Sequence, residues 1–140
     1  GYWNQPEATH HAISEDHWFR TGDVGYFDEQ GFYYICDRVK DMIISGGENV
    51  YPAEVESVLY AHPAVAEVAV VGMPDPQWGE AVVAVVALKA GSTLTLEEVR
   101  EFTSERLARY KVPKQLRIVE ALPRNPTGKI LKYKLRETAP

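Results

Sequence analysis

Two stretches of almost unbroken apolar residues lie in the middle of the chain, at 65–72 and 81–88. Each has the length of a β-strand and is far shorter than the roughly 18 residues that a membrane-spanning helix needs. A strand that is apolar at nearly every position must be covered on both faces. We therefore expect both runs to be central strands of a sheet, joined by a loop over 73–80 that contains Pro74 and Pro76.

The segments after residue 41 supply further strands and the helices that would cover this sheet. Pro52 can open a helix at its first position, and Thr95 with Glu98 forms a capping box that opens another. Short strands are expected at 42–44 and 115–120, and a short basic helix ends the chain. This order, β-α-β-β-α-β-α, predicts an α+β fold with a small, mostly antiparallel sheet flanked by helices.

The N-terminal part of the chain has a different character. Residues 1–20 are rich in aromatic residues and histidines and show no clear periodicity. Two β-rich runs, 24–26 and 32–35, flank a turn that contains glycine, which predicts a β-hairpin. The charged run 37–41 fits a solvated linker. The chain starts at Gly1 rather than at a methionine, which is consistent with a piece of a longer protein.

Composition argues against several classes of function. The net charge of −5 comes from acids and bases mixed along the chain, so we expect no nucleic-acid partner. No secretory signal opens the chain, and no membrane span is expected. The single cysteine, Cys36, cannot form an internal disulfide, which favours a cytoplasmic location. The histidines and Cys36 have no metal-ligand spacing, so we expect no metal site.

Three polar loops contain groups that could bind a ligand. Asp23, which follows Gly22, could accept hydrogen bonds from both hydroxyls of a ribose. The glycines within 45–49 could let a ligand approach the backbone closely. Lys129, at the end of the loop 123–129, could contact a phosphate or carboxylate oxygen, although this loop lacks the first glycine of a Walker A motif. Taken singly, each loop fits an ordinary solvated turn as well.

Taken together, the loops occur in a familiar order and spacing. Residues 18–23 (WFRTGD), 37–56 (DRVKDMIISGGENVYPAEVE) and 123–129 (PRNPTGK) resemble the C-terminal part of adenylate-forming acyl-CoA synthetases. Their superfamily also contains luciferases and the adenylation domains of peptide synthetases. Residues 1–9 (GYWNQPEAT) resemble the end of the large domain, so the resemblance covers essentially the whole chain. It implies an ATP-dependent carboxylate–CoA ligase that acts on a fatty or similar apolar acid.

The resemblance implies a chain in two parts. Residues 1–37 would be the C-terminal end of the large adenylation (AMP-binding) domain, and residues 38–140 would be a mobile C-terminal lid domain. Lys40 would be the hinge, at a position where many acyl-CoA synthetases carry Asp. The lid domain would rotate between one pose for adenylation and another for thioester formation.

The resemblance also implies roles for single residues in the first reaction. Asp23 would hold the ribose hydroxyls of ATP and of the acyl-adenylate, and Arg38 would support the same ribose. Lys129 would reach the α-phosphate and the carboxylate during adenylation. Mg²⁺ would sit on the phosphates, with its ligands mostly in the large domain.

Another set of residues would serve the second reaction, in which coenzyme A attacks the acyl-adenylate. Gly46, Gly47 and Glu48 would line the path of the pantetheine arm. Some relatives contact the nucleotide of coenzyme A at the positions of Tyr110, Lys111 and Lys114.

Several alternatives stay open at this point. The same glycine loop would serve a carrier-protein thiol, as in a fatty acyl-AMP ligase or an adenylation module. The chain by itself would be non-catalytic, because the phosphate loop and the acyl pocket of such enzymes belong to the large domain. In some relatives the lysine that corresponds to Lys129 is acetylated, which implies a protein acetyltransferase as a further partner. The identity of the acid is not encoded in these residues.

Overall fold

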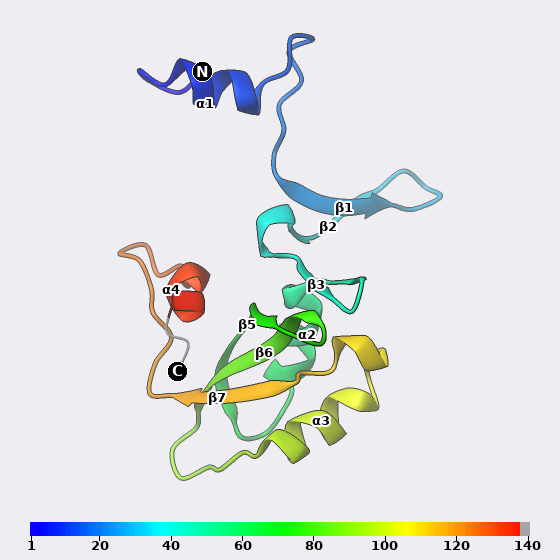
Figure 1. Ribbon diagram of the computed structural model, residues 1–140, viewed down its shortest axis with the longest axis vertical. Coiled ribbons are helices and arrows are strands. Elements are labelled where there is room, and N and C mark those ends of the chain that lie inside the picture. Colours follow the sequence, from blue (N-terminus) through cyan, green and yellow to red (C-terminus); the bar gives the residue numbers. More distant parts are fainter. Residues whose placement is uncertain (138–140) are drawn as a thin grey trace. The chain divides into compact units, whose positions relative to one another are not determined.

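A computed structural model describes residues 1–137 of the chain, and Figure 1 labels its helices and strands. The residues group into two compact units, the first of which is Gly1–Lys40, while the second begins at Asp41. The boundary expected from the sequence lies slightly earlier, between 37 and 38. The last residues of the expected lid domain, 138–140, lie outside the described residues. No helix within 1–137 is long and apolar enough to cross a membrane.

The first unit contains one short helix and a β-hairpin. Helix α1 (Pro6–Ala12) has its proline at the start and buries none of its residues. This helix was not predicted, because it has no apolar face that would produce a helical period. Strand β1 (Asp23–Phe27) pairs antiparallel with β2 (Tyr33–Arg38), so the predicted hairpin is confirmed.

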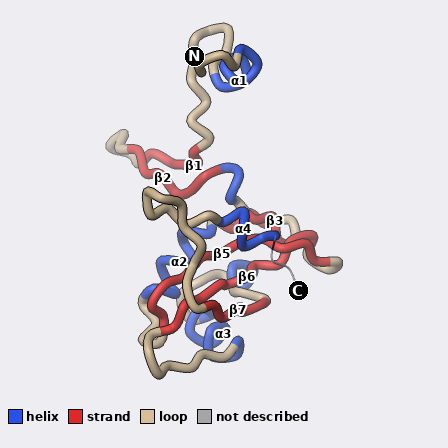
Figure 2. The backbone as a smooth tube through the Cα atoms, turned by 90° about the vertical axis from the view of Figure 1, so that its left-hand side faces the viewer, coloured by secondary structure: helices blue, strands red, loops and turns tan. Residues whose placement is uncertain are grey.

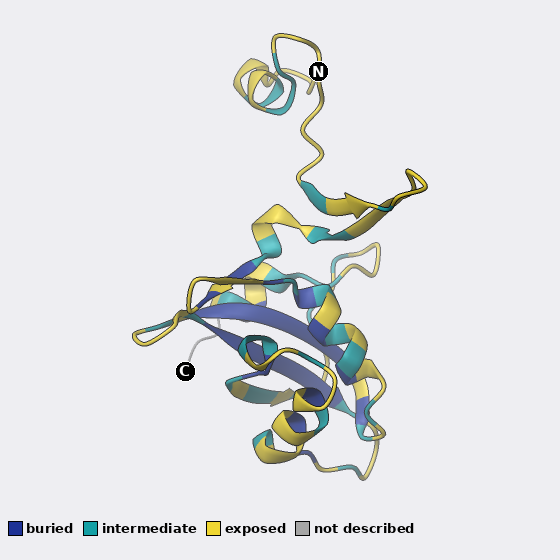
Figure 3. Ribbon diagram, turned by 90° about the vertical axis from the view of Figure 1, so that its right-hand side faces the viewer, coloured by how far each residue is buried: buried dark blue, intermediate teal, exposed yellow. Residues whose placement is uncertain are grey.

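The first unit has no core of its own. None of its residues, 1–40, is buried, and Figure 3 shows the hairpin only in the colours of exposed and intermediate residues. Trp3 is 95% exposed, Trp18 77% and Tyr33 82%. On the hairpin, the exposed rings of Tyr26 and Tyr34 stack, and those of Phe27 and Tyr33 lie in contact. Contiguous large apolar side chains on a surface usually mark a face that another surface covers.

The second unit contains a five-stranded, mostly antiparallel sheet. Its strands follow the order β4 (Glu48–Val50), β3 (Ile43–Ser45), β6 (Gly79–Leu88) and β5 (Val65–Asp75). Strand β7 (Gln115–Val119) pairs with β6 and runs parallel to it, whereas the other described neighbours of β6 are antiparallel. The predicted α+β fold with a small, mostly antiparallel sheet is therefore confirmed.

The two long strands differ from the prediction in their ends and in the place of β5. Most of the segment 73–80, predicted to be a loop, continues the strands, because β5 runs to Asp75 and β6 starts at Gly79. Strand β5 is an edge strand rather than a central one, since within residues 1–137 it pairs only with β6. An edge strand tolerates a residue without an N–H group, which explains why Pro74 does not end β5.

Helices cover both faces of the sheet, as the two apolar runs predict. Helices α2 (Pro52–Tyr60) and α3 (Leu96–Ser104) contribute to the core on one face, and α4 (Lys132–Glu137) contributes to the core on the other. Successive side chains of a strand point to opposite faces, so each strand feeds both cores. The first core includes Val55, Leu59, Val68, Val70, Val82, Ala84, Val86 and Val99. The second includes Ala69, Val71, Val83, Val85, Leu122 and Leu135.

The capping box predicted at the start of α3 is present. The Thr95 hydroxyl accepts a hydrogen bond from the Glu98 N–H (3.2 Å), and Glu98 Oε2 accepts one from the Thr95 N–H (2.7 Å). The hydrogen bonds from the backbone and hydroxyl of Thr95 hold the pKa of the Glu98 carboxyl below its usual value. These reciprocal bonds satisfy amide groups that a helix start otherwise leaves without partners.

Replacing Thr95 with alanine is expected to lower the free energy of unfolding by about 1 kcal/mol, because the Glu98 N–H loses its acceptor. Urea denaturation of the chain measures this change. Thr93→Ala is the matched control, since Thr93 is an exposed threonine two positions earlier in the preceding loop. Equal stability of the two variants would contradict the assigned role of the cap.

Candidate functional site

Asp23 and Arg38, the two residues expected at a ribose, lie opposite each other in the hairpin of the first unit. Arg38 Nε lies 2.8 Å from Asp23 Oδ1, and Arg38 Nη1 donates to the Thr21 carbonyl (3.3 Å). Gly22 makes the turn into β1 with a φ of +74°. Asp23 Oδ2 has no hydrogen-bond partner within residues 1–137, so it can accept one from a ligand hydroxyl.

Lys40, the expected hinge, is the last residue of the first unit. It lies in the short 3₁₀ turn η1 (Val39–Asp41), and it is exposed. The next residue, Asp41, accepts a hydrogen bond from Arg136 of α4 at 3.0 Å. This ion pair attaches the start of the second unit to its last helix.

Gly46 and Gly47 form the two-residue turn of the β3–β4 hairpin, across which Ser45 pairs with Glu48. Their φ angles are +62° and +84°, as in the mirror-image turns that suit two-residue hairpins. Glycine adopts such angles without a steric penalty. Residues 45–49 were predicted to form a loop, and β4 was not predicted, although two adjacent glycines between strand residues are a hairpin signal.

The turn between β5 and β6 supports this glycine hairpin. The Gly46 N–H donates to the Trp78 carbonyl (2.8 Å), and the Ile44 N–H donates to Glu80 Oε2 (2.8 Å). A Cβ atom on Gly46 would lie 3.0 Å from Trp78 Cε3, which is tighter than an ordinary contact. Trp78 therefore anchors the turn between β5 and β6 against the glycine hairpin.

A cavity of about 1030 Å³ opens beside the glycine hairpin in the second unit. Ser45 and Glu48 of the hairpin contribute to its wall, together with Trp78. Tyr110 and Lys114, two of the residues expected near a nucleotide, also line it. The remaining lining residues come from α3 and the segment that follows it: Arg100, Glu101, Ser104, Arg109, Val112 and Pro113.

Cations outnumber carboxylates in the cavity wall, with three against two. Arg100 is held by the carbonyls of Pro113 (3.3 Å) and Lys114 (2.9 Å). Lys114 Nζ lies 5.2 Å from the centroid of the Trp78 ring. Burial, followed by the charges of Arg100 and Arg109, lowers the pKa of the Lys114 ammonium. A bound anion would relieve this repulsion, so the cavity suits an anionic ligand.

Ser45, one of the residues around the cavity, has a buried hydroxyl without a partner among the described residues. The residue is only 2% exposed, and its Oγ is the one buried side-chain oxygen or nitrogen within residues 1–137 that lacks a hydrogen-bond partner. Leaving a buried hydroxyl unpaired costs about 1–3 kcal/mol.

Lys111, the third residue expected near a nucleotide, has a different partner. Its Nζ donates to both carboxylate oxygens of Glu54 in α2, each at 2.7 Å. The hydrogen bond to Glu54 raises the pKa of the Lys111 ammonium. The pair ties the 3₁₀ turn η2 (Arg109–Lys111) to α2 and so supports Tyr110, whereas Lys111 itself does not line the cavity.

Lys129 lies in an ordered loop between β7 and α4, a connection that Figure 2 shows in tan. Arg124 and Ile130 form an isolated antiparallel bridge at the base of the loop. The Gly128 N–H donates to the Asn125 carbonyl (2.9 Å), which closes a turn. The Lys129 side chain is exposed and makes no hydrogen bond or ion pair within the described part of the chain. Its ammonium group is therefore available to a ligand.

These groups can bind ligands at distinct places. Asp23 with Arg38 suits a diol, Lys129 can neutralise a developing negative charge, and the cavity suits a larger anionic ligand. Within residues 1–137, no group of three or more His, Cys, Asp or Glu side chains could hold a metal. Sequence reasoning missed Arg100 and Arg109, because a charged residue on a helix or in a turn usually faces solvent.

Residues 54–129 match the family model of the AMP-binding enzyme C-terminal domain. The chain is 57% identical, over 97% of its length, to the long-chain-fatty-acid–CoA ligase FadD13 of Mycobacterium tuberculosis. It is 49% identical, over its whole length, to a 2-succinylbenzoate–CoA ligase of a Geobacillus species. The chain spans only 27% and 28% of these two relatives.

A solved structure of a CoA synthetase is also similar to this chain. The o-succinylbenzoate CoA synthetase (MenE) of Bacillus subtilis, in complex with the acyl-adenylate intermediate OSB-AMP, matches 99% of this chain with a TM-score of 0.90. The two sequences are 43% identical, and the match covers 28% of the MenE chain. At this identity the likeness extends beyond the fold to the sequence.

Proposed function

This chain belongs to the AMP-binding enzyme C-terminal domain family, and we propose that it is the C-terminal part of an ATP-dependent carboxylate–CoA ligase. One observation carries the proposal. The second unit presents two separate binding features, the exposed Lys129 ammonium on its loop and the Gly46–Gly47 hairpin beside a basic cavity. A two-step ligase needs one group for phosphoryl chemistry and another for the incoming thiol.

In the first step, a carboxylate oxygen of the acid attacks the α-phosphorus of ATP, and the bond to pyrophosphate breaks. Two anions meet in this step, so a cation near the reacting oxygens lowers the barrier. We assign that role to Lys129. Asp23, oriented by Arg38, would hold the ribose through the free Oδ2. Mg²⁺ would share the neutralisation, and we assign its protein ligands mostly to the large domain.

In the second step, the thiol sulfur of coenzyme A attacks the acyl carbon and AMP leaves. The Gly46–Gly47 turn has no side chains, so a pantetheine arm could pass close to its backbone, with Glu48 beside it. The nucleotide of coenzyme A would occupy the cavity, where Tyr110 offers a ring and Lys114 a charge. Lys111 would support this surface through its bond to Glu54.

The domain assignment follows from the same proposal. Residues 1–37 would be the end of the large domain, 38–140 the lid domain, and Lys40 the hinge between its two poses. The absence of any buried residue in 1–40 supports the first part, because a segment without a core needs a larger body to pack on. Rotation of the lid domain about Lys40 would move Lys129 away from the reaction centre and bring the Gly46 hairpin to it.

We favour free coenzyme A over a carrier protein as the acceptor. A carrier protein presents a pantetheine arm with a single phosphate, whereas coenzyme A adds a nucleotide with further anionic groups. A cavity with an excess of cations suits the second ligand better. We expect a fatty or similar apolar acid, since the relative FadD13, at 57% identity, is a long-chain-fatty-acid–CoA ligase.

Changing Lys114 to alanine in the full-length enzyme is expected to raise the KM for coenzyme A about tenfold, because the ligand loses one charged hydrogen-bonding group. ATP–pyrophosphate exchange, which needs no coenzyme A, should keep its rate. Lys89→Ala, at an exposed lysine away from the cavity, is the control. An unchanged KM for coenzyme A would remove the cavity from the proposed acceptor site.

Turnover assays test the function as a whole. The full-length enzyme should convert ATP, coenzyme A and a fatty or aromatic acid to AMP, pyrophosphate and a thioester. The 140-residue chain alone should be inactive, because the proposal places the phosphate loop and acyl pocket in the large domain. Turnover by the isolated chain would contradict this division of the active site.

We also propose that the enzyme works in the cytoplasm, in line with the single cysteine of this chain.

A further proposal concerns regulation: acetylation of Lys129 by a protein acetyltransferase would switch adenylation off. The exposure of Lys129 supports access by such a transferase. Acetylation would remove the charge that the first step requires. Mass spectrometry of the protein from its native cells tests this, and an unmodified Lys129 under all growth conditions would contradict it.

A further inference from the structure

We propose that Arg124 and Asn125 are positioning residues that hold Lys129 in place for adenylation. This inference rests on the function proposed above and extends it to two residues outside the ligand contacts. The reason is the flexibility of lysine, whose long side chain can place a charge accurately only if its backbone is fixed.

Asn125 holds the backbone of Lys129 from both sides. Its Oδ1 accepts hydrogen bonds from the N–H of Lys129 (2.8 Å) and from the N–H (3.1 Å) and hydroxyl (2.8 Å) of Thr127. Its own N–H donates to the Lys129 carbonyl (2.9 Å). Both backbone polar groups of Lys129 are therefore bonded to a single residue, and one oxygen atom of that residue organises the turn.

Arg124 attaches this turn to the sheet. Its Nη1 donates to the Gly128 carbonyl at 2.6 Å, directly before Lys129. Its Nη2 pairs with Oε1 of Glu67, which belongs to strand β5. The guanidinium thus joins the tip of the loop to a strand of the sheet that is far away in sequence.

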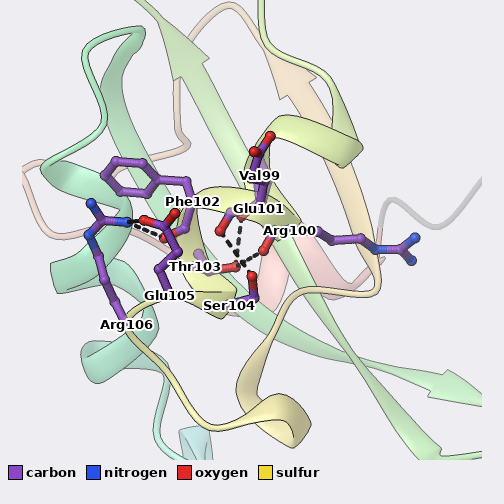
Figure 4. A network of polar contacts seen from close by, with 8 residues as sticks. All are labelled: Val99, Arg100, Glu101, Phe102, Thr103, Ser104, Glu105 and Arg106. Atoms are coloured by element: carbon purple, nitrogen blue, oxygen red, sulfur yellow. Dashed lines mark hydrogen bonds and ion pairs between the residues drawn. The ribbon is translucent and has the colours of Figure 1, made fainter.

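Arg106 makes the same kinds of bond without any such link. It donates to the Phe102 carbonyl (2.6 Å) and pairs with Glu105 (2.9 Å), so both partners lie within its own helix end (Figure 4). Exposed ion pairs of this kind contribute only about 0–1 kcal/mol to stability. The contacts of Arg124 differ because they fix the loop that carries Lys129, whereas those of Arg106 fix only the end of a helix. We therefore infer that the contacts of Arg124 set the position of Lys129.

The expected consequence is a loss of adenylation rate without a loss of the second step. A displacement of a reacting group by about 1 Å can cost about a hundredfold in rate. In the full-length enzyme, Asn125→Ala and Arg124→Ala should lower the kcat of ATP–pyrophosphate exchange about tenfold or more, with little change in the KM for ATP. Thioester formation from supplied acyl-adenylate should keep its rate.

A conservative variant separates positioning from general folding. Asn125→Asp keeps an acceptor oxygen for the three donors and should recover most of the exchange rate, whereas Asn125→Ala should not. Arg106→Ala is the control for Arg124→Ala, since it removes a similarly exposed arginine that also bonds a backbone carbonyl and a glutamate. The melting temperature of each variant is measured alongside.

The possible outcomes are distinct. Wild-type exchange in Arg124→Ala and Asn125→Ala, with loss in Lys129→Ala, overturns the positioning role and leaves the proposed function standing. Equal losses in both half-reactions, together with a lowered melting temperature, make the two residues merely structural and also overturn it. If Asn125→Asp does not recover the exchange rate, the positioning role is overturned as well. Wild-type exchange in Lys129→Ala would instead overturn the proposed function itself.

Discussion

ATP–pyrophosphate exchange by the full-length enzyme is expected to fall at least about a hundredfold when Lys129 is changed to alanine, because one preorganised group that faces developing charge supplies about that much. The Lys129 ammonium has no partner within residues 1–137, so its removal leaves no buried group unpaired and should not unfold the domain. Exchange at saturating acid and ATP measures the first half-reaction alone.

The control for this prediction is Lys89→Ala, which removes another exposed lysine. Thioester formation from supplied acyl-adenylate should stay within about threefold of the wild-type rate in both variants. An exchange rate in Lys129→Ala equal to that of the control would show that Lys129 does not take part in adenylation.

Thioester formation from supplied acyl-adenylate should fall about a hundredfold when Gly46 is changed to leucine, while exchange persists. A side chain at Gly46 meets the Trp78 ring at 3.0 Å, and the backbone φ of +62° disfavours any residue with a Cβ. The ring or the hairpin must shift, and either movement changes the wall of the cavity. Single-turnover formation of acyl-CoA measures this step.

Gly91→Leu is the matched control for Gly46→Leu. Gly91 also has a positive φ, +75°, but nothing lies within 4 Å of the position that its Cβ would occupy. The control therefore carries the backbone strain without the contact to Trp78. A similar loss of thioester formation in both variants would attribute the effect to strain, and the role of the hairpin would be wrong.

The sheet and its two covered faces could be predicted because they depend on local apolar patterns. The runs 65–72 and 81–88 require burial on both faces wherever they lie, and the structure buries nearly all of their residues. The place of β5 at the edge could not be read, since strand order depends on long-range pairing. Pro74 suggested a loop, yet an unpaired edge makes its missing N–H harmless.

The glycine hairpin shows a signal that was present but misinterpreted. Gly46 and Gly47 were expected to form a loop because paired glycines also occur where a strand turns into a helix. In the structure they are the two residues of a tight hairpin, a geometry that the neighbouring strand residues on both sides indicate. The pattern could have been recognised from the sequence.

The cavity illustrates what the sequence could not provide. Tyr110 and Lys114 were expected near a ligand through the resemblance, whereas Arg100 lies on the polar side of a helix, where arginine is usually solvated. Its contribution depends on the contact between α3 and the segment before β7, which no spacing rule predicts. The bond between Lys111 and Glu54 joins residues of equally distant segments.

The central claim is that one unit serves two reactions through two different loops. Measuring both half-reactions in Lys129→Ala and in Gly46→Leu, within the same full-length enzyme, tests this claim most directly. We predict a crossed result, in which Lys129→Ala loses exchange and keeps thioester formation while Gly46→Leu does the reverse. Parallel losses of both half-reactions in each variant would contradict the account, because the two loops would then act as a single site.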